Sequence, residues 1–137
     1  MNVIETQLEQ LKEKFPTSVF IPNVNPKSSI LGTIHISDFK LPVGWNTNTT
    51  DVYFEIPAGY PCACPQHFHT SPNLLLKENR LPRNTQLIDI NDKSQLVFFW
   101  RITRQIHTFE QRTNWSPNSD TLLTYVRVIQ SRFNNAI

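Results

Sequence analysis

The chain has 137 residues, of which 39% are hydrophobic, and its 13 basic and 11 acidic side chains leave a net charge of +2. This length suits one domain, residues 1–137, with enough apolar material for one core. The balanced charge, without a basic stripe, argues against a nucleic-acid surface. No apolar run approaches the roughly 18 residues of a membrane span, and the N-terminus lacks the apolar stretch of a signal peptide. We therefore expect a cytoplasmic protein with no membrane partner and with reduced thiols.

The first predicted element is a helix. Ile4, Leu8, Leu11 and Phe15 recur at spacings of four, three and four, which places them on one apolar stripe. Pro16 would end this helix.

Extended segments are predicted next, over residues 18–21, 29–37 and 52–56. In the second of these, Ile34 and Ile36 alternate with His35, which is the period of a half-buried strand. Residues 41–50 are typical of a turn between the second and third segments.

The middle of the chain is less definite. Four prolines between residues 57 and 72 exclude a regular central strand there, although a short extended piece over residues 66–70 fits between them. Residues 73–94 are polar with scattered leucines and predict no definite element. Residues 96–102 are apolar and aromatic enough for a strand or for a turn of buried helix.

A second helix is predicted near the C-terminus, where Leu122, Val126, Ile129 and Phe133 repeat the spacing of the first helix. The candidate N-terminal caps are Ser116-Pro117 and Ser119-Asp120, and Asn134-Asn135 would end the helix. The order of helix, antiparallel meander, proline-rich crossover, irregular region and helix predicts an α+β fold.

Two short motifs add to this pattern. Residues 60–65 read Tyr-Pro-Cys-Ala-Cys-Pro, and residues 115–117 read Trp-Ser-Pro. The first resembles the Tyr-Pro-x-x-Pro-Pro turn of ubiquitin-conjugating (E2/UBC-like) proteins, with Cys64 in place of a proline. The second resembles the Trp-Ser-Pro that begins a helix after the active site of those proteins. The resemblance implies a UBC-like fold with an N-terminal helix, a four-stranded antiparallel meander, a long active-site loop region and a C-terminal helix.

The chain resembles, more closely and nearly end to end, the prokaryotic E2 family E, a bacterial branch of that superfamily. Leu-Pro-x-Gly-Trp at residues 41–45 and Pro-x-Gly-Tyr-Pro at residues 57–61 carry this resemblance. It implies an E1-like activating enzyme and a ubiquitin-like modifier as partners, and no cofactor is expected. Because the N-terminal helix carries the E1 contact in the superfamily, the resemblance implies that Gln7, Gln10 and Lys14 contribute to docking of the E1-like enzyme.

The position of the catalytic cysteine is occupied differently here. A conjugating enzyme accepts the modifier on a thiolate, which in the family lies about eight residues before the Trp-Ser-Pro motif. The same count back from Trp115 gives His107, and no cysteine follows Pro65. His107 has three open interpretations, namely a structural loop histidine, a non-thioester functional group such as a proton carrier, and a metal ligand.

Cys62 and Cys64 are the alternative nucleophiles, although they lie in the turn after the third predicted strand. They could instead fill buried space. With His67 and His69 they form a Cys-x-Cys-x2-His-x-His cluster of potential zinc ligands. The ligand spacing of structural zinc sites is usually different, so no metal site is assigned.

Three functional hypotheses follow. The preferred one is an E2-like pathway protein without standard thioester chemistry, which binds the E1-like enzyme or the modifier. The second is an active conjugating enzyme that uses Cys62 or Cys64. The third is a metal-binding protein on the same scaffold.

Overall fold

The computed structural model describes residues 2–25, 27–90, 92–99, 101–102, 105–106 and 115–135. Its elements are, in chain order, α1 (Val3–Lys14), β1 (Ser18–Pro22), β2 (Ile30–Lys40), β3 (Thr49–Pro57), β4 (Phe68–Thr70), the 3₁₀ turn η1 (Lys77–Asn79), β5 (Thr85–Ile90), β6 (Lys93–Phe98), β7 (Arg101–Ile102), β8 (Gln105–Ile106) and α3 (Leu122–Asn134). None of the described helices has the length and apolar character that crossing a membrane requires.

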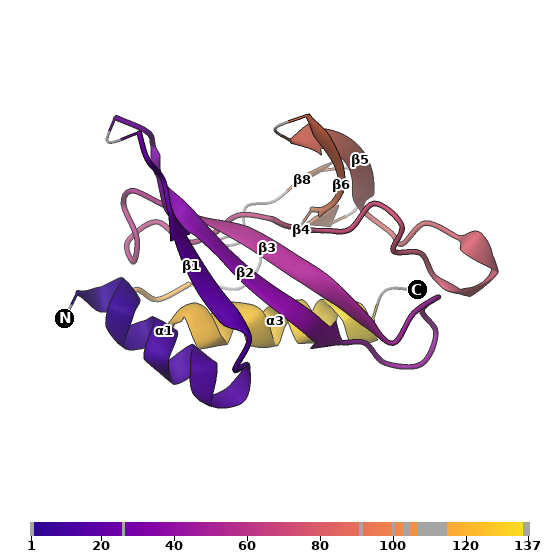
Figure 1. The fold of residues 1–137 in the computed structure, drawn as a ribbon, viewed down its shortest axis with the longest axis horizontal. Helices are drawn as coiled ribbons and strands as arrows, with labels where there is room; N and C mark the ends of the chain where they lie inside the picture. Colours follow the sequence, from indigo (N-terminus) through magenta and orange to yellow (C-terminus); the bar gives the residue numbers. More distant parts are fainter. Residues whose placement is uncertain are drawn as a thin grey trace.

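Six strands form one antiparallel sheet in the order β1-β2-β3-β4-β6-β5, and β7 pairs with β8 in a separate two-stranded sheet. The helices α1 and α3 lie together on one face of the sheet, and the hairpin of β5 and β6 continues the sheet beyond β4 (Figure 1). The predicted α+β fold is confirmed. The main sheet has six strands rather than the four of the predicted meander, because residues 85–98 add a hairpin.

Both predicted helices are present, and local hydrogen bonds explain where they begin. The side chain of Asn2 accepts a hydrogen bond from the backbone N–H of Glu5 at 2.8 Å, which caps α1. In α3, Thr121 and Thr124 exchange side-chain and backbone hydrogen bonds in a capping box. The predicted caps at residues 116–117 and 119–120 were wrong, because those residues form a separate turn in front of the helix in which Asp120 bonds the backbone of residue 116.

The core lies between the helices and the covered face of the sheet. One row of paired positions runs across four strands, and its members are at most 1% exposed: Ile34, Phe54, Phe68 and Phe98. The ring of Phe133, from α3, meets Phe68 and Phe98 edge-on. Burying aromatic rings in this way supplies most of the stabilisation available to a domain of this size.

Residues 73–94 predicted no definite element, but they include η1, β5 and the start of β6, and the segment around Leu75 bonds the turn between β2 and β3. The backbone N–H of Asn46 donates to the carbonyl of Leu75 at 2.8 Å, and the N–H of Lys77 donates to the carbonyl of Gly44 at 2.9 Å. Leu74 and Leu76 are almost fully buried. These two leucines are therefore core residues of a loop, which neither a helical nor a strand period reveals, whereas Leu81 and Leu87 of the same stretch are exposed.

Candidate functional site

The turn between β3 and β4 is held by side chains from two distant parts of the chain. The phenol of Tyr60 donates a hydrogen bond to the amide oxygen of Gln7 on α1. The indole N–H of Trp115 donates to the carbonyl of Pro61 at 2.9 Å, and the Trp115 and Tyr60 rings lie 6.1 Å apart. The Tyr60-Pro61 peptide bond is cis. The Tyr-Pro and Trp-Ser-Pro motifs, separate in sequence, thus touch each other in the structure.

The two cysteines of this turn have different environments. Cys64 is fully buried and belongs to the core, and the side-chain nitrogen of Gln66 lies 3.5 Å from its sulfur. Cys62 is exposed, and neither cysteine forms a disulfide, as predicted. The interpretation that the cysteines fill buried space therefore holds for Cys64 alone. Of the two candidate nucleophiles, Cys62 is the one open to a large acyl donor.

The two histidines after the turn do not join the cysteines in a metal site. His67 is exposed, with its ring 5.7 Å from that of Phe99, whereas His69 is 9% exposed and hydrogen-bonds Gln95. Among the residues that the structure describes, no group of three or more His, Cys, Asp or Glu side chains is arranged to hold a metal ion. The metal-binding hypothesis gains no support from this part of the chain.

His107, at the position predicted for the catalytic cysteine, lies outside the described residues, as do residues 108–114. The description resumes at Trp115, directly before the turn that leads into α3. The side chain and backbone of Asp120 hold this turn through hydrogen bonds to Ser116 at 2.7 and 2.8 Å.

The three predicted E1-docking residues occupy different environments on α1. The amide oxygen of Gln7 accepts hydrogen bonds from the Tyr60 phenol and from the backbone N–H of Leu122, the latter at 3.0 Å. Gln7 therefore joins α1 to the turn after β3 and to the start of α3. Gln10 and Lys14 are exposed, so they are the members of this trio whose side chains reach solvent.

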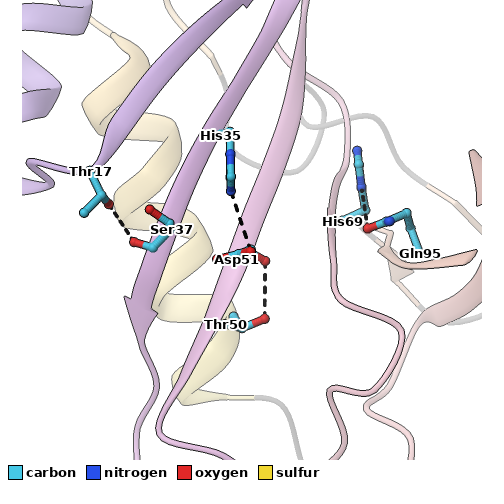
Figure 2. Close-up of polar contacts among 7 residues, drawn as sticks. All are labelled: Thr17, His35, Ser37, Thr50, Asp51, His69 and Gln95. Carbon is cyan, nitrogen blue, oxygen red and sulfur yellow. Dashed lines mark hydrogen bonds and ion pairs between the residues drawn. The ribbon is translucent and has the colours of Figure 1, made fainter. Parts of the chain in front are cut away.

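The open face of the sheet carries a second candidate site. His35, Tyr53 and His69 lie side by side on β2, β3 and β4, and their rings stack in one row. The His35 and Tyr53 ring centroids are 4.3 Å apart with planes 15° from parallel, and those of Tyr53 and His69 are 5.2 Å apart at 11°. At the far end, the ring nitrogen Nδ1 of His69 lies 3.4 Å from the amide oxygen of Gln95 on β6 (Figure 2).

The other end of the row faces a carboxylate. The Nε2 atom of His35 lies 3.7 Å from a carboxylate oxygen of Asp51 (Figure 2). This separation exceeds that of a hydrogen bond, and Nε2 is buried without a hydrogen-bond partner among the described residues. The Asp51 and His35 side chains remain partly exposed, so the attraction between them is weakened by solvent.

Burial shifts the pKa of two side chains in this row, Tyr53 and His69. It raises the pKa of the Tyr53 phenol, and the charge of Asp51 raises it further. It lowers the pKa of His69, and the hydrogen bond to the amide oxygen of Gln95 and the charge of Glu55 oppose that shift only in part. At neutral pH the His69 imidazole and the Tyr53 phenol are therefore both uncharged.

A groove of about 720 Å³ runs along this open face. Its floor includes the Tyr53 and His69 rings, and its walls include residues of the β1–β2 hairpin and of the β5–β6 hairpin. Glu55 and Lys93 supply one charge of each sign to the lining. The described residues that line the groove include no cysteine, so they offer no thiol to an acyl group.

His35, Tyr53 and Gln95 were not predicted to be neighbours. A signal was present, because alternation along each strand places these residues opposite the buried apolar ones. Which residues of different strands lie side by side depends on register, however, and the β2–β3 register shifts between Ile36 and Phe39. Alternation alone does not reveal that shift.

Comparison with known families gives one result. The family model of prokaryotic E2 family E matches residues 22–136, from the end of β1 through α3. No curated protein and no solved structure matches the chain.

Proposed function

Because the chain belongs to prokaryotic E2 family E, we propose that it is an E2-like protein of a bacterial ubiquitin-like modification pathway that acts by binding rather than by carrying the modifier as a thioester. The observation that carries this proposal is that no cysteine follows Pro65. Standard transfer needs a thiolate close to the Trp-Ser-Pro motif. In this proposal His107 occupies that position without forming a thioester.

The proposed partners are an E1-like enzyme and a ubiquitin-like modifier. Exposed side chains on α1 support the first of these contacts, by analogy with the superfamily. Gln10 and Lys14 are open to a partner, whereas the amide oxygen of Gln7 is engaged within the protein. We therefore assign Gln10 and Lys14 to the docking surface and expect Gln7 to act through the position and stability of α1.

A second candidate function is an active conjugating enzyme that uses Cys62. The exposure of this thiol favours it, together with the contacts from Gln7 and Trp115 that fix the turn around it. Cys64 is less suited to that role, because a fully buried thiol cannot meet the C-terminus of a modifier without opening of the core.

A charging assay separates the two functions. The purified protein is mixed with its cognate E1-like enzyme, ubiquitin-like modifier and ATP, and thiol-sensitive adducts are sought on a non-reducing gel. We expect no such adduct, together with measurable binding to the E1-like enzyme or the modifier. An adduct that persists in Cys64→Ser and disappears in Cys62→Ser would establish the conjugating enzyme and refute the binding role.

The docking surface is tested separately by calorimetric titration of the E1-like enzyme. The Gln10→Ala, Lys14→Glu double variant is expected to weaken binding by about tenfold, because it removes two contacts and reverses one charge. Lys40→Glu, which reverses another exposed charge at the end of β2, serves as the control. Equal binding by the double variant and the control would contradict the assignment of α1.

A further inference from the structure

The two edges of the sheet are formed by β1 and β5. An edge strand presents backbone N–H and C=O groups that no neighbouring strand uses, and folded proteins usually protect them. The two edges of this protein are protected to very different extents, and the register of the ladders shows which backbone groups each one offers.

Hydrogen bonds fix the direction of the backbone groups in β5. The N–H of Phe99 donates to the carbonyl of Asn84 at 2.8 Å, which marks these two residues as a hydrogen-bonded pair in the β5–β6 ladder. Such pairs alternate along an antiparallel ladder, so every second residue after Asn84 bonds β6. The intervening three, Thr85, Leu87 and Asp89, direct their N–H and C=O groups outward.

The same reasoning shows that β1 is protected. The N–H of Asn23, directly after β1, donates to the carbonyl of Leu31 at 2.9 Å. Because such pairs alternate along the ladder, Ser18, Phe20 and Pro22 direct their backbone groups away from β2. Proline has no N–H, and the N–H of Ser18 donates to the carbonyl of Phe15, directly after the end of α1. Within the described part of the chain, the outer edge of β1 therefore retains one donor without a backbone partner, at Phe20.

The edge of β5 carries none of these protections. It has three outward donors and no proline, and the described part of the chain contributes no backbone hydrogen bond to them. At its centre, Leu87 is 53% exposed. An unprotected edge with an exposed apolar side chain at its midpoint is suited to pairing with another strand.

We propose that β5 pairs antiparallel with β5 of a second copy of this chain, about a two-fold axis that passes beside Leu87. In this register Leu87 faces its own symmetry mate, and Thr85 faces Asp89 of the second copy. The three pairs, each exchanging two hydrogen bonds, use all outward backbone groups of both strands. The two apolar side chains come together on one face of the joined sheet.

The composition of β5 favours this register over its neighbours. A two-fold axis beside Asp89 would place two carboxylates opposite each other, which is unfavourable across a strand pair. An axis beside Thr85 would leave Asp89 and its backbone groups without a partner strand. Pairing of two six-residue strands would bury well below about 1,200 Å², in the range of weak and transient complexes, and we expect a dissociation constant on the order of 100 µM.

Thiol cross-linking tests the pairing and its register. Leu87→Cys is made in a Cys62→Ser background, which removes the exposed native thiol, and is treated with a thiol cross-linker that spans about 8 Å. The two Leu87 positions would lie about 5.5 Å apart, whereas the two Asp89 positions would lie about 14 Å apart along the strands. We expect efficient dimer formation by Leu87→Cys and little by Asp89→Cys.

Val19→Cys in the same background is the matched control, because Val19 is 51% exposed at the other edge of the sheet. Equal cross-linking of Leu87→Cys and Val19→Cys would overturn the proposal. So would preferential cross-linking of Asp89→Cys, which would indicate a different register.

Sedimentation equilibrium then measures the association without cross-linking. The wild-type protein is expected to form dimers as its concentration rises towards about 1 mM. Leu87→Lys, which places two ammonium groups across the axis, should raise the dissociation constant about tenfold or more, and Val19→Lys should leave it unchanged. A wild-type protein that stays monomeric over the whole range overturns the proposal, and an extended peptide of another protein would then be the occupant of this edge to seek.

Discussion

The two faces of the sheet are built from the same strands and yet differ in almost every physical property. On the covered face, Phe54 is fully buried among rings and aliphatic side chains. One residue earlier in β3, Tyr53 lies half-buried between two imidazole rings on the open face. A step of one residue thus separates a position that stabilises the fold from one that remains available for recognition.

The largest expected effect on stability comes from alanine substitutions at these two adjacent residues. Phe54→Ala should lower the free energy of unfolding by about 3–5 kcal/mol, because it leaves a cavity that the surrounding core cannot fill. Tyr53→Ala should lower it by only about 1–2 kcal/mol, since the open face is partly solvated. Urea denaturation followed by tryptophan fluorescence compares the two, and equal losses would show that the two faces are equally structural.

The same contrast recurs within the turn after β3. Cys64→Ser introduces a hydroxyl into a fully buried position and should cost about 1–3 kcal/mol. Cys62→Ser, two residues earlier and exposed, should change stability by less than about 0.5 kcal/mol. Thermal unfolding of both variants measures the difference. A larger loss for Cys62→Ser would contradict the assigned burial of this turn.

The third expected effect depends on pH. Burial lowers the pKa of His69 below its ordinary value of 6.5, so the unfolded chain binds protons more readily than the native protein does. The free energy of unfolding should therefore fall as the pH drops through 6.5. His69→Gln removes this contribution, so the stability gap between wild type and variant should depend on pH between 7.5 and about 5.5.

Glu55, His67 and Gln95 also influence His69. Comparing His69→Gln with wild type at each pH removes most of the contribution of the other titrating groups. A gap that does not vary with pH would mean that His69 titrates alike in the native and unfolded states.

A small effect is also expected at the outer end of the ring row. His35 contacts Asp51 only at 3.7 Å, and both side chains are partly exposed. His35→Ala should therefore change the free energy of unfolding at pH 7 by at most about 0.5–1 kcal/mol. A loss as large as that of Phe54→Ala, measured in the same urea titration, would place His35 in the structural core instead.

Much of the covered face could be predicted from the sequence. The apolar spacing that predicted the two helices corresponds to residues that pack on the core. The short extended piece predicted over residues 66–70 contains the three residues of β4, although β4 lies in the interior of the sheet, where the prolines had argued against a regular central strand. These predictions succeed because burial imposes a period on each element, independently of what it packs against.

The added hairpin and the open-face row could not be predicted in the same way. Residues 85–98 pair with each other and with β4, and their alternation is obscured because Leu87 is exposed while Val97 is buried. The role of Gln7 was hidden for a related reason. Its two hydrogen-bond partners lie 53 and 115 residues away, and no local pattern indicates contacts over such distances.

The position of α3 in the chain has a consequence for synthesis on the ribosome. The indole N–H of Trp45 donates to the carbonyl of Phe133, 88 residues later, and α3 supplies a large part of the cover over the sheet (Figure 1). A nascent chain that has reached the end of β6 therefore has all six strands of the main sheet but not the helix that buries Phe54 and Phe98. Until some 35 further residues have emerged, this apolar face is a binding site for chaperones and a risk for aggregation.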